Sequence, residues 1–165
     1  MTSAEKPQGE QTGQVESLLA TPNLADALES EQFRHFLDQV PIAIVVSEMK
    51  NPERIVYANP EFEKLTGQPS VELEGQPWRV LKGEGEGAHA GQKLGAAVAE
   101  SGDFVGTFRI DRASGAPVVV DAYSNVIEDD SGTPAFRLAA LVDVTVHGPG
   151  QREAFEQQLR EKDML

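Results

Sequence analysis

The stretch GQPWRVLKGEGEG, residues 75–87, holds the side chains of this sequence whose types and spacing best suit ligand binding. Trp78 offers a large aromatic surface that can stack on a small ligand or gate its entry. The adjacent Arg79 offers a guanidinium for an anionic ligand. Each also has a plainer interpretation: Trp78 can fill a cavity or pack on a helix surface, and Arg79 can form an exposed salt bridge. The sequence leaves these alternatives open.

Other reactive residues are sparse. The chain has no cysteine, which excludes disulfides, thiolate catalysis and zinc sites built on sulfur. No serine lies in a G-x-S-x-G context, and the acidic pair Glu72 and Glu74 has no opposing histidine or carboxylate. The run GEGEG lacks a following Lys-Ser/Thr, and its two glutamates would repel a phosphate. We therefore expect no catalytic residue and no metal site.

Length and charge limit the function classes. At 165 residues with 39% hydrophobic residues, the chain can build one core of ordinary size. With 27 acidic and 14 basic residues, the net charge of −13 would repel phosphate backbones and anionic lipids. There is no signal-like N-terminus and no long apolar run. The sequence predicts a cytoplasmic protein that binds neither nucleic acid nor membrane.

The chain divides into segments by composition. Residues 1–22 are polar and predict a disordered tail. Residues 23–40 carry apolar side chains near helical spacing, begin at the plausible N-cap Asn23 and end before Pro41, which predicts one amphipathic helix. Its apolar stripe includes Leu28, Phe33, Phe36, Leu37 and Val40.

The remaining elements predict an α+β fold. Residues 42–48 and 53–59 read as two strands joined by a turn, and Asn59, Pro60 and Gly67 predict a short capped helix. A longer helix is expected over residues 89–102, followed by three strands separated by turn clusters. Together they predict a five-stranded antiparallel sheet with short helices on one face and flanking helices at both ends.

Four stretches in this order resemble the PAS family: IVYANPEFEKLTG, VELEGQPWRVL, RASGAPVVVDAYSNVIEDDSG and LVDVT. The resemblance spans about residues 33–146, and we place the PAS domain itself at 41–146. It implies a sensor in which a pocket between sheet and helices holds a ligand or cofactor. Changes in such a pocket reach a flanking helix that controls an output domain.

Within the PAS family the chain resembles the LOV subgroup, through Gly75, Arg79, Leu81 and Gly83 of its flavin helix. Trp78 stands where LOV domains carry the cysteine of the photoadduct, so that photocycle is impossible here. Polar positions that hold the flavin in LOV domains align with apolar residues, so we expect no tightly bound flavin and keep FMN or FAD as the alternative. The candidate pocket residues are Trp78, Arg79, Leu81, Ile110, Val120 and Leu141.

His89 has a weaker resemblance, to the haem-ligating histidine of some PAS domains. The alternative is a solvent-exposed or capping residue near the start of the expected helix. The sequence favours the second interpretation, because no other haem feature accompanies it.

The C-terminal residues 147–165 restart as a helix after Gly148-Pro149-Gly150, with Phe155 and Leu159 one helical turn apart. The final LREKDML resembles the segment before the phosphoacceptor helix of HWE-type and related sensor kinases. It can equally precede a cyclic-dinucleotide synthase domain, or form a terminal helix that packs on the sheet.

These observations predict the sensory PAS fragment of a bacterial signalling protein, with a histidine kinase as the output domain outside this chain. The fragment itself is expected not to be an enzyme. It would dimerise through the flanking helices, with Leu28, Phe33, Phe36, Leu37, Val40, Phe155 and Leu159 as contact residues, and a small-molecule ligand is possible. The alternatives are a flavin-binding photo or redox sensor without the cysteine, and a ligand-free dimerisation or protein-interaction module.

Overall fold

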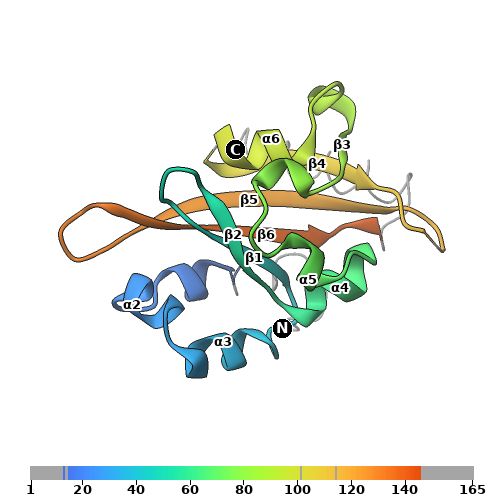
Figure 1. Cartoon of the computed structure of the whole chain (residues 1–165). Coiled ribbons are helices and arrows are strands. Elements are labelled where there is room, and N and C mark those ends of the chain that lie inside the picture. The colour runs from blue at the N-terminus through green and yellow to red at the C-terminus, as the bar shows by residue number, and fades with distance from the viewer. Residues whose placement is uncertain (1–12, 14, 101, 114, 146–165) are drawn as a thin grey trace, which may run out of the picture.

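One antiparallel sheet forms the centre of the structure, a computed structural model that describes residues 13, 15–100, 102–113 and 115–145 (Figure 1). The strands lie in the order β2-β1-β6-β5-β4-β3. Their bounds are β1 Ala43–Glu48, β2 Arg54–Ala58, β3 Glu84–Gly85, β4 Asp103–Ile110, β5 Val118–Glu128 and β6 Pro134–Asp143. The predicted α+β class is confirmed. A sixth strand joins the five predicted, because the two-residue β3 pairs with β4 and is too short to show an alternation pattern.

The helix after the first hairpin, α4 (Pro60–Thr66), begins and ends as predicted. The Asn59 side chain accepts a hydrogen bond from the backbone N–H of Phe62 at 3.1 Å. Pro60 occupies the first turn, where its missing N–H costs nothing. Gly67 closes the helix in the left-handed region, with φ 76°. The N-cap, proline and glycine signals therefore fix this helix locally.

The segment after α4 contains α5 (Ser70–Leu73), the 3-10 turns η2 (Trp78–Val80) and η3 (Gly87–His89), and α6 (Leu94–Glu100). The helix predicted over 89–102 is wrong in its first part, since α6 begins only at Leu94. Gly91 lies at φ 90°, which a continuous right-handed helix cannot contain. The chain therefore turns between η3 and α6, and the shorter helix packs on the sheet.

Both faces of the sheet are buried, which explains the continuous apolar run of β1. Ala43 and Val45 of β1 belong to the inner cluster, formed with α4, α5, η2 and α6. Ile44 and Val46 belong to the outer cluster on the opposite face, because successive side chains of a strand alternate. A strand covered on both sides needs apolar residues at every position.

Two helices, α2 (Leu24–Leu28) and α3 (Glu31–Leu37), cover the outer face (Figure 1). The single helix predicted over 23–40 is wrong: it breaks at Ser30, whose side chain accepts a hydrogen bond from the N–H of Phe33 at 3.4 Å and so starts a new helix. Residues 15–19 are also helical, with Val15 and Leu18 buried in the outer cluster. The predicted disordered tail therefore does not include them, because these two apolar side chains anchor the segment. The predicted C-terminal helix lies outside the described residues.

Candidate functional site

The indole of Trp78 is buried in the inner cluster, with 3% of its surface exposed. Its Nε1 donates to Glu53 Oε2 at 2.8 Å and to Ser47 Oγ at 3.0 Å. The neighbouring Arg79 is exposed, so the 3-10 turn sends one of the two adjacent side chains inward and the other to solvent. Of the alternatives for Trp78, the structure shows a side chain that fills the core and is fixed by hydrogen bonds.

Glu53 accepts further hydrogen bonds from the sheet. Its Oε2 accepts from Ser47 Oγ at 2.6 Å and from Arg137 Nε at 2.9 Å. Ser47 and Arg137 are partners across β1 and β6, so both side chains lie on the inner face at the end where β1 finishes and β6 begins. The indole N–H of Trp78 completes the set of donors around this carboxylate.

Arg137 also connects Glu53 to α6. Its Nη1 donates to the carbonyl of Val98 at 3.3 Å and to Ser124 Oγ at 3.4 Å. The Ser124 hydroxyl donates to the same Val98 carbonyl at 2.9 Å. Ser47, Glu53, Trp78, Ser124 and Arg137 are called the Trp78 network below. It ties the first hairpin, η2, β5, β6 and α6 together.

The electrostatics of this network keep Glu53 ionised. Burial alone raises the pKa of the Glu53 carboxyl, but hydrogen bonds from Ser47, Arg137 and Trp78 and the charge of Arg137 act against it. The net result is a pKa below the ordinary value. Arg137, 8% exposed, therefore faces a charged partner, as a buried guanidinium requires.

Five of the six predicted pocket residues come together in the structure. Trp78, Leu81, Ile110, Val120 and Leu141 are all buried and belong to the inner cluster. Arg79 is separated from them and lies at the surface, where it lines a cavity of about 390 Å³ together with Lys82 and Lys93. The inner face is thus an apolar core around Trp78, and Arg79, Lys82 and Lys93 lie outside it.

The residues present do not fit a flavin. The positions expected to hold its polar edge, Ile110, Val120 and Leu141, are buried among apolar side chains. Among the described residues, every buried polar side chain already has a protein partner, and these are Ser47, Asn59, Thr66, Thr107, Ser124 and Arg137. A buried amide or carbonyl of a ligand would therefore stay unpaired, at about 1–3 kcal/mol each.

Helix α6 also lies very close to the backbone around η2. A Cβ atom placed on Gly95 of α6 would lie 2.2 Å from the Trp78 carbonyl oxygen. A Cβ on Gly83 would lie 2.9 Å from the Cβ of Leu94. Only glycine allows these contacts, so α6 packs directly on the backbone that precedes and follows Leu81.

His89 and the glycine-rich run form a surface structure. His89 ends η3, its ring stacks on Phe108 at 6.4 Å between centroids, and its Nδ1 accepts from the N–H of Thr107 at 3.4 Å. Glu84 pairs with Lys93 at 2.6 Å. His89 is thus a half-buried packing residue at the edge of the sheet. Among the described residues, no group of three or more histidine, aspartate or glutamate side chains is arranged to hold a metal ion.

The predicted dimer residues divide into two groups. Leu28 and Leu37 are buried against the outer face of the sheet, so they are not available to a partner. Phe33 and Val40 are half-buried, and Phe36 is 54% exposed. Phe155 and Leu159 lie outside the described residues.

Sequence reasoning missed the partners of Trp78. Glu53 is the first residue of the predicted strand 53–59, directly after a turn, and Arg137 is 84 residues further along the chain. One signal was present: Arg137 interrupts the apolar run AFRLAAL, and a cation inside a buried strand needs a carboxylate nearby. The identity of that carboxylate follows only from the strand register.

The fold is an α+β domain with helices on both faces of an antiparallel sheet, and comparison with known proteins gives its family. Residues 41–146 match the PAS domain family, so the chain belongs to that family. The described residues include no helix that is both long and apolar enough to cross a membrane.

The chain is similar to two curated proteins. It is 29% identical over 118 residues to the bacterioopsin transcriptional activator of Halobacterium salinarum, a match that covers 71% of this chain and 18% of that protein. It is 26% identical over 141 residues to Phototropin-1A of Oryza sativa subsp. japonica, covering 85% of this chain and 15% of that one. The chain thus spans less than a fifth of the length of these relatives.

Among solved structures, the chain is similar to the LOV domain of a blue-light activated histidine kinase from Erythrobacter litoralis. The identity is 22% and the TM-score 0.50, and the match covers 64% of this chain and 98% of that one. This likeness supports the fold. The family match makes the chain a PAS domain, and this structure shares its fold.

Proposed function

We propose that this chain is the sensory part of a larger bacterial, cytoplasmic signalling protein and regulates an output domain, a histidine kinase, without cysteine-adduct photochemistry. The chain itself would not be the enzyme. The kinase is supported by the resemblance of LREKDML to the segment before a phosphoacceptor helix, and by the likeness to the LOV domain of a histidine kinase. Partners would be a second copy of the chain and the kinase domain.

The observation that carries the proposal is the position of Trp78. The indole occupies the inner cluster and is hydrogen-bonded to Glu53 and Ser47. The indole of Trp78 takes up space in the inner cluster, where a flavin would be expected from the LOV resemblance, and it has no thiol that could form an adduct. A sensor built in this way would respond through packing of the sheet and its covering helices, by a shift between two conformations.

Asn59 connects β1 and α4 to the flanking helix α3 by hydrogen bonds. Its amide nitrogen donates to the carbonyls of Leu37 at 3.1 Å and Ile42 at 2.8 Å, and its Oδ1 accepts from the N–H of Ile44. The same oxygen caps α4. A displacement of β1 or α4 would therefore move Asn59 and strain its hydrogen bond to the Leu37 carbonyl at the end of α3.

The second candidate, a flavin-binding sensor without the cysteine, is favoured by the LOV likeness. The apolar residues at Ile110, Val120 and Leu141 oppose it. The two candidates predict different colours for the purified protein.

An absorption spectrum of the purified full chain, before and after incubation with excess FMN, tests the proposal. We expect no flavin bands and no change in thermal unfolding on adding FMN. A ligand at about 100 times its Kd would add about 2.7 kcal/mol to the free energy of unfolding, which is easily measured. Flavin that copurifies at one equivalent, or a stabilisation of this size, would contradict the proposal and favour the second candidate.

A further inference from the structure

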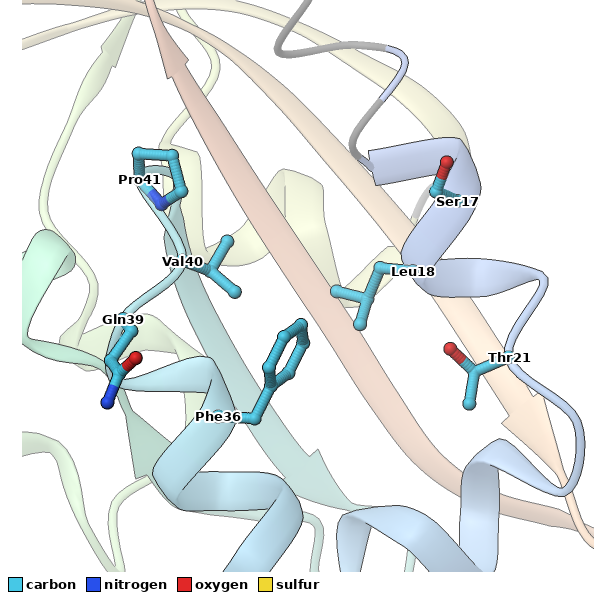
Figure 2. A pocket seen from close by; sticks show the side chains of 7 residues that line it. All are labelled: Ser17, Leu18, Thr21, Phe36, Gln39, Val40 and Pro41. Carbon is cyan, nitrogen blue, oxygen red and sulfur yellow. The ribbon is translucent and has the colours of Figure 1, made fainter.

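A second pocket lies on the outer face of the sheet, between the helix at residues 15–19 and the end of α3 (Figure 2). Its volume is about 400 Å³. Small-molecule sites span about 300–1,000 Å³, so this space can hold a small ligand. The described residues that line it come from two segments, 17–21 and 36–41. It is called the outer pocket below.

The floor and walls of the outer pocket are apolar. Figure 2 shows Leu18, Phe36 and Val40 turned toward the same space from opposite sides, with Pro41 beyond Val40. Leu18 is buried in the outer cluster, whereas Phe36 is 54% exposed. An exposed aromatic ring at the wall of a cavity offers one face for a flat apolar group.

The remaining lining side chains are polar but neutral: Ser17, Thr21 and Gln39. Within the part of the chain that the structure describes, none of the three side chains hydrogen-bonds another residue. This differs from the inner cluster, where every buried polar side chain of the described residues has a partner. The outer pocket therefore has donors and acceptors free for a ligand.

Among the described residues, no ionisable side chain lines the outer pocket, although a quarter of the chain is charged. A charged ligand would leave water without gaining an opposite charge, which is unfavourable. A neutral ligand avoids this cost and gains apolar contact with Leu18, Phe36 and Val40. The lining thus discriminates by charge as well as by size.

We propose that the outer pocket binds a neutral small molecule that combines one flat apolar ring system with a hydrogen-bonding group. Such a ligand touches both walls, so it holds the helix at residues 15–19 against α3. Its role as the signal of the sensor rests on the proposed function, whereas its binding does not.

Titration of the isotope-labelled full chain with indole, followed by amide NMR, tests this inference. Indole is neutral and flat and has one N–H donor. We expect shifts concentrated at residues 17–21 and 36–41. Indole-3-carboxylate, which adds a negative charge, should bind at least about tenfold more weakly, a difference of about 1.4 kcal/mol.

Variants of the pocket give a second measurement. Phe36→Ala removes the exposed ring, and Thr21→Phe fills the space; each should weaken indole binding about tenfold. Neither residue is fully buried, so both variants should fold, which their thermal unfolding verifies. Val71→Ala is the matched control, because Val71 is an exposed apolar residue on α5, outside the outer pocket.

Four outcomes would overturn the inference. The first two are an absence of shifts on adding indole and shifts that centre on the inner cluster around Trp78. Stronger indole binding after the double substitution Phe155→Ser and Leu159→Ser would mean that the C-terminal segment of the chain occupies the pocket. Loss of a dimer on adding indole, seen by light scattering, would mean that a second copy occupies it. None of these outcomes bears on the FMN measurement, so a failure here leaves the proposed function standing.

Discussion

The inner and the outer face of the sheet are both covered by helices, but different interactions hold the covers. On the inner face, Trp78, Glu53 and Arg137 form a hydrogen-bonded network in which each member fixes the next. On the outer face, Leu28 and Leu37 pack by apolar contact, and the exposed Phe36 lies beside an open pocket. Hydrogen bonds from Asn59 to the Leu37 carbonyl and from Tyr57 to Asp38 hold only the C-terminal end of α3. Because apolar contact tolerates sliding better than directional bonds do, we expect the part of the outer cover away from this end to move more easily than the inner cover.

The largest effect should come from Trp78→Ala. Removing this buried indole leaves a cavity in the inner cluster and removes a donor from Glu53, so we expect a loss of about 3–5 kcal/mol in the free energy of unfolding. Urea denaturation measures it. Trp78→Phe keeps most of the ring and should cost less than half as much. Equal losses for the two variants would mean that the hydrogen bonds, and not the volume, dominate.

Two adjacent residues of α3 should behave in opposite ways. Leu37→Ala removes a fully buried side chain of the outer cluster and should cost about 2–5 kcal/mol. Phe36→Ala should change stability by no more than about 0.5 kcal/mol, since the ring is mostly exposed. If Phe36 lies in a dimer interface, light scattering should show a smaller dimer fraction for this variant. A large destabilisation by Phe36→Ala would show that the outer cover is more rigid than proposed.

A smaller loss than for Trp78→Ala or Leu37→Ala should come from Glu53→Gln, about 1–2 kcal/mol, because the carboxylate keeps some solvent contact. The direction in which the stabilising contribution of Glu53 changes with pH follows from its pKa. The folded pKa of Glu53 lies below the unfolded value of 4.5, so its contribution is full above pH 4.5 and is lost as the pH falls through the folded pKa. The variant should therefore differ most from the parent at neutral pH and converge with it in acid. A difference that grows in acid would contradict this account.

Most helices and strands of the fold can be predicted from local sequence signals. The features that the sequence did not reveal depend on pairing between residues far apart in the chain. The N-cap Asn59, the proline after it and Gly67 identify α4 from a window of nine residues. The break at Ser30 was missed because the apolar spacing continues through it, and only the structure shows that Ser30 starts a new helix.

For the candidate site, the resemblance to the LOV pattern placed Ile110, Val120 and Leu141 at the inner face, and all three are buried. The direction of Trp78 did not follow, because a 3-10 turn has no period long enough to assign a face. The Glu53 and Arg137 pair depends on the register of β6 against β1, which no local pattern encodes.

The close approach at Gly95 has a consequence for protein engineering. Replacing Trp78 by cysteine would restore a thiol at one position of the chain, but the backbone of η2 would still touch α6 where a Cβ at Gly95 has no room. Backbone contact thus sets the spacing between η2 and α6, and a substitution of the side chain at residue 78 would leave that spacing unchanged. A library designed for flavin binding would therefore vary this junction and the apolar residues Ile110, Val120 and Leu141 as well as residue 78.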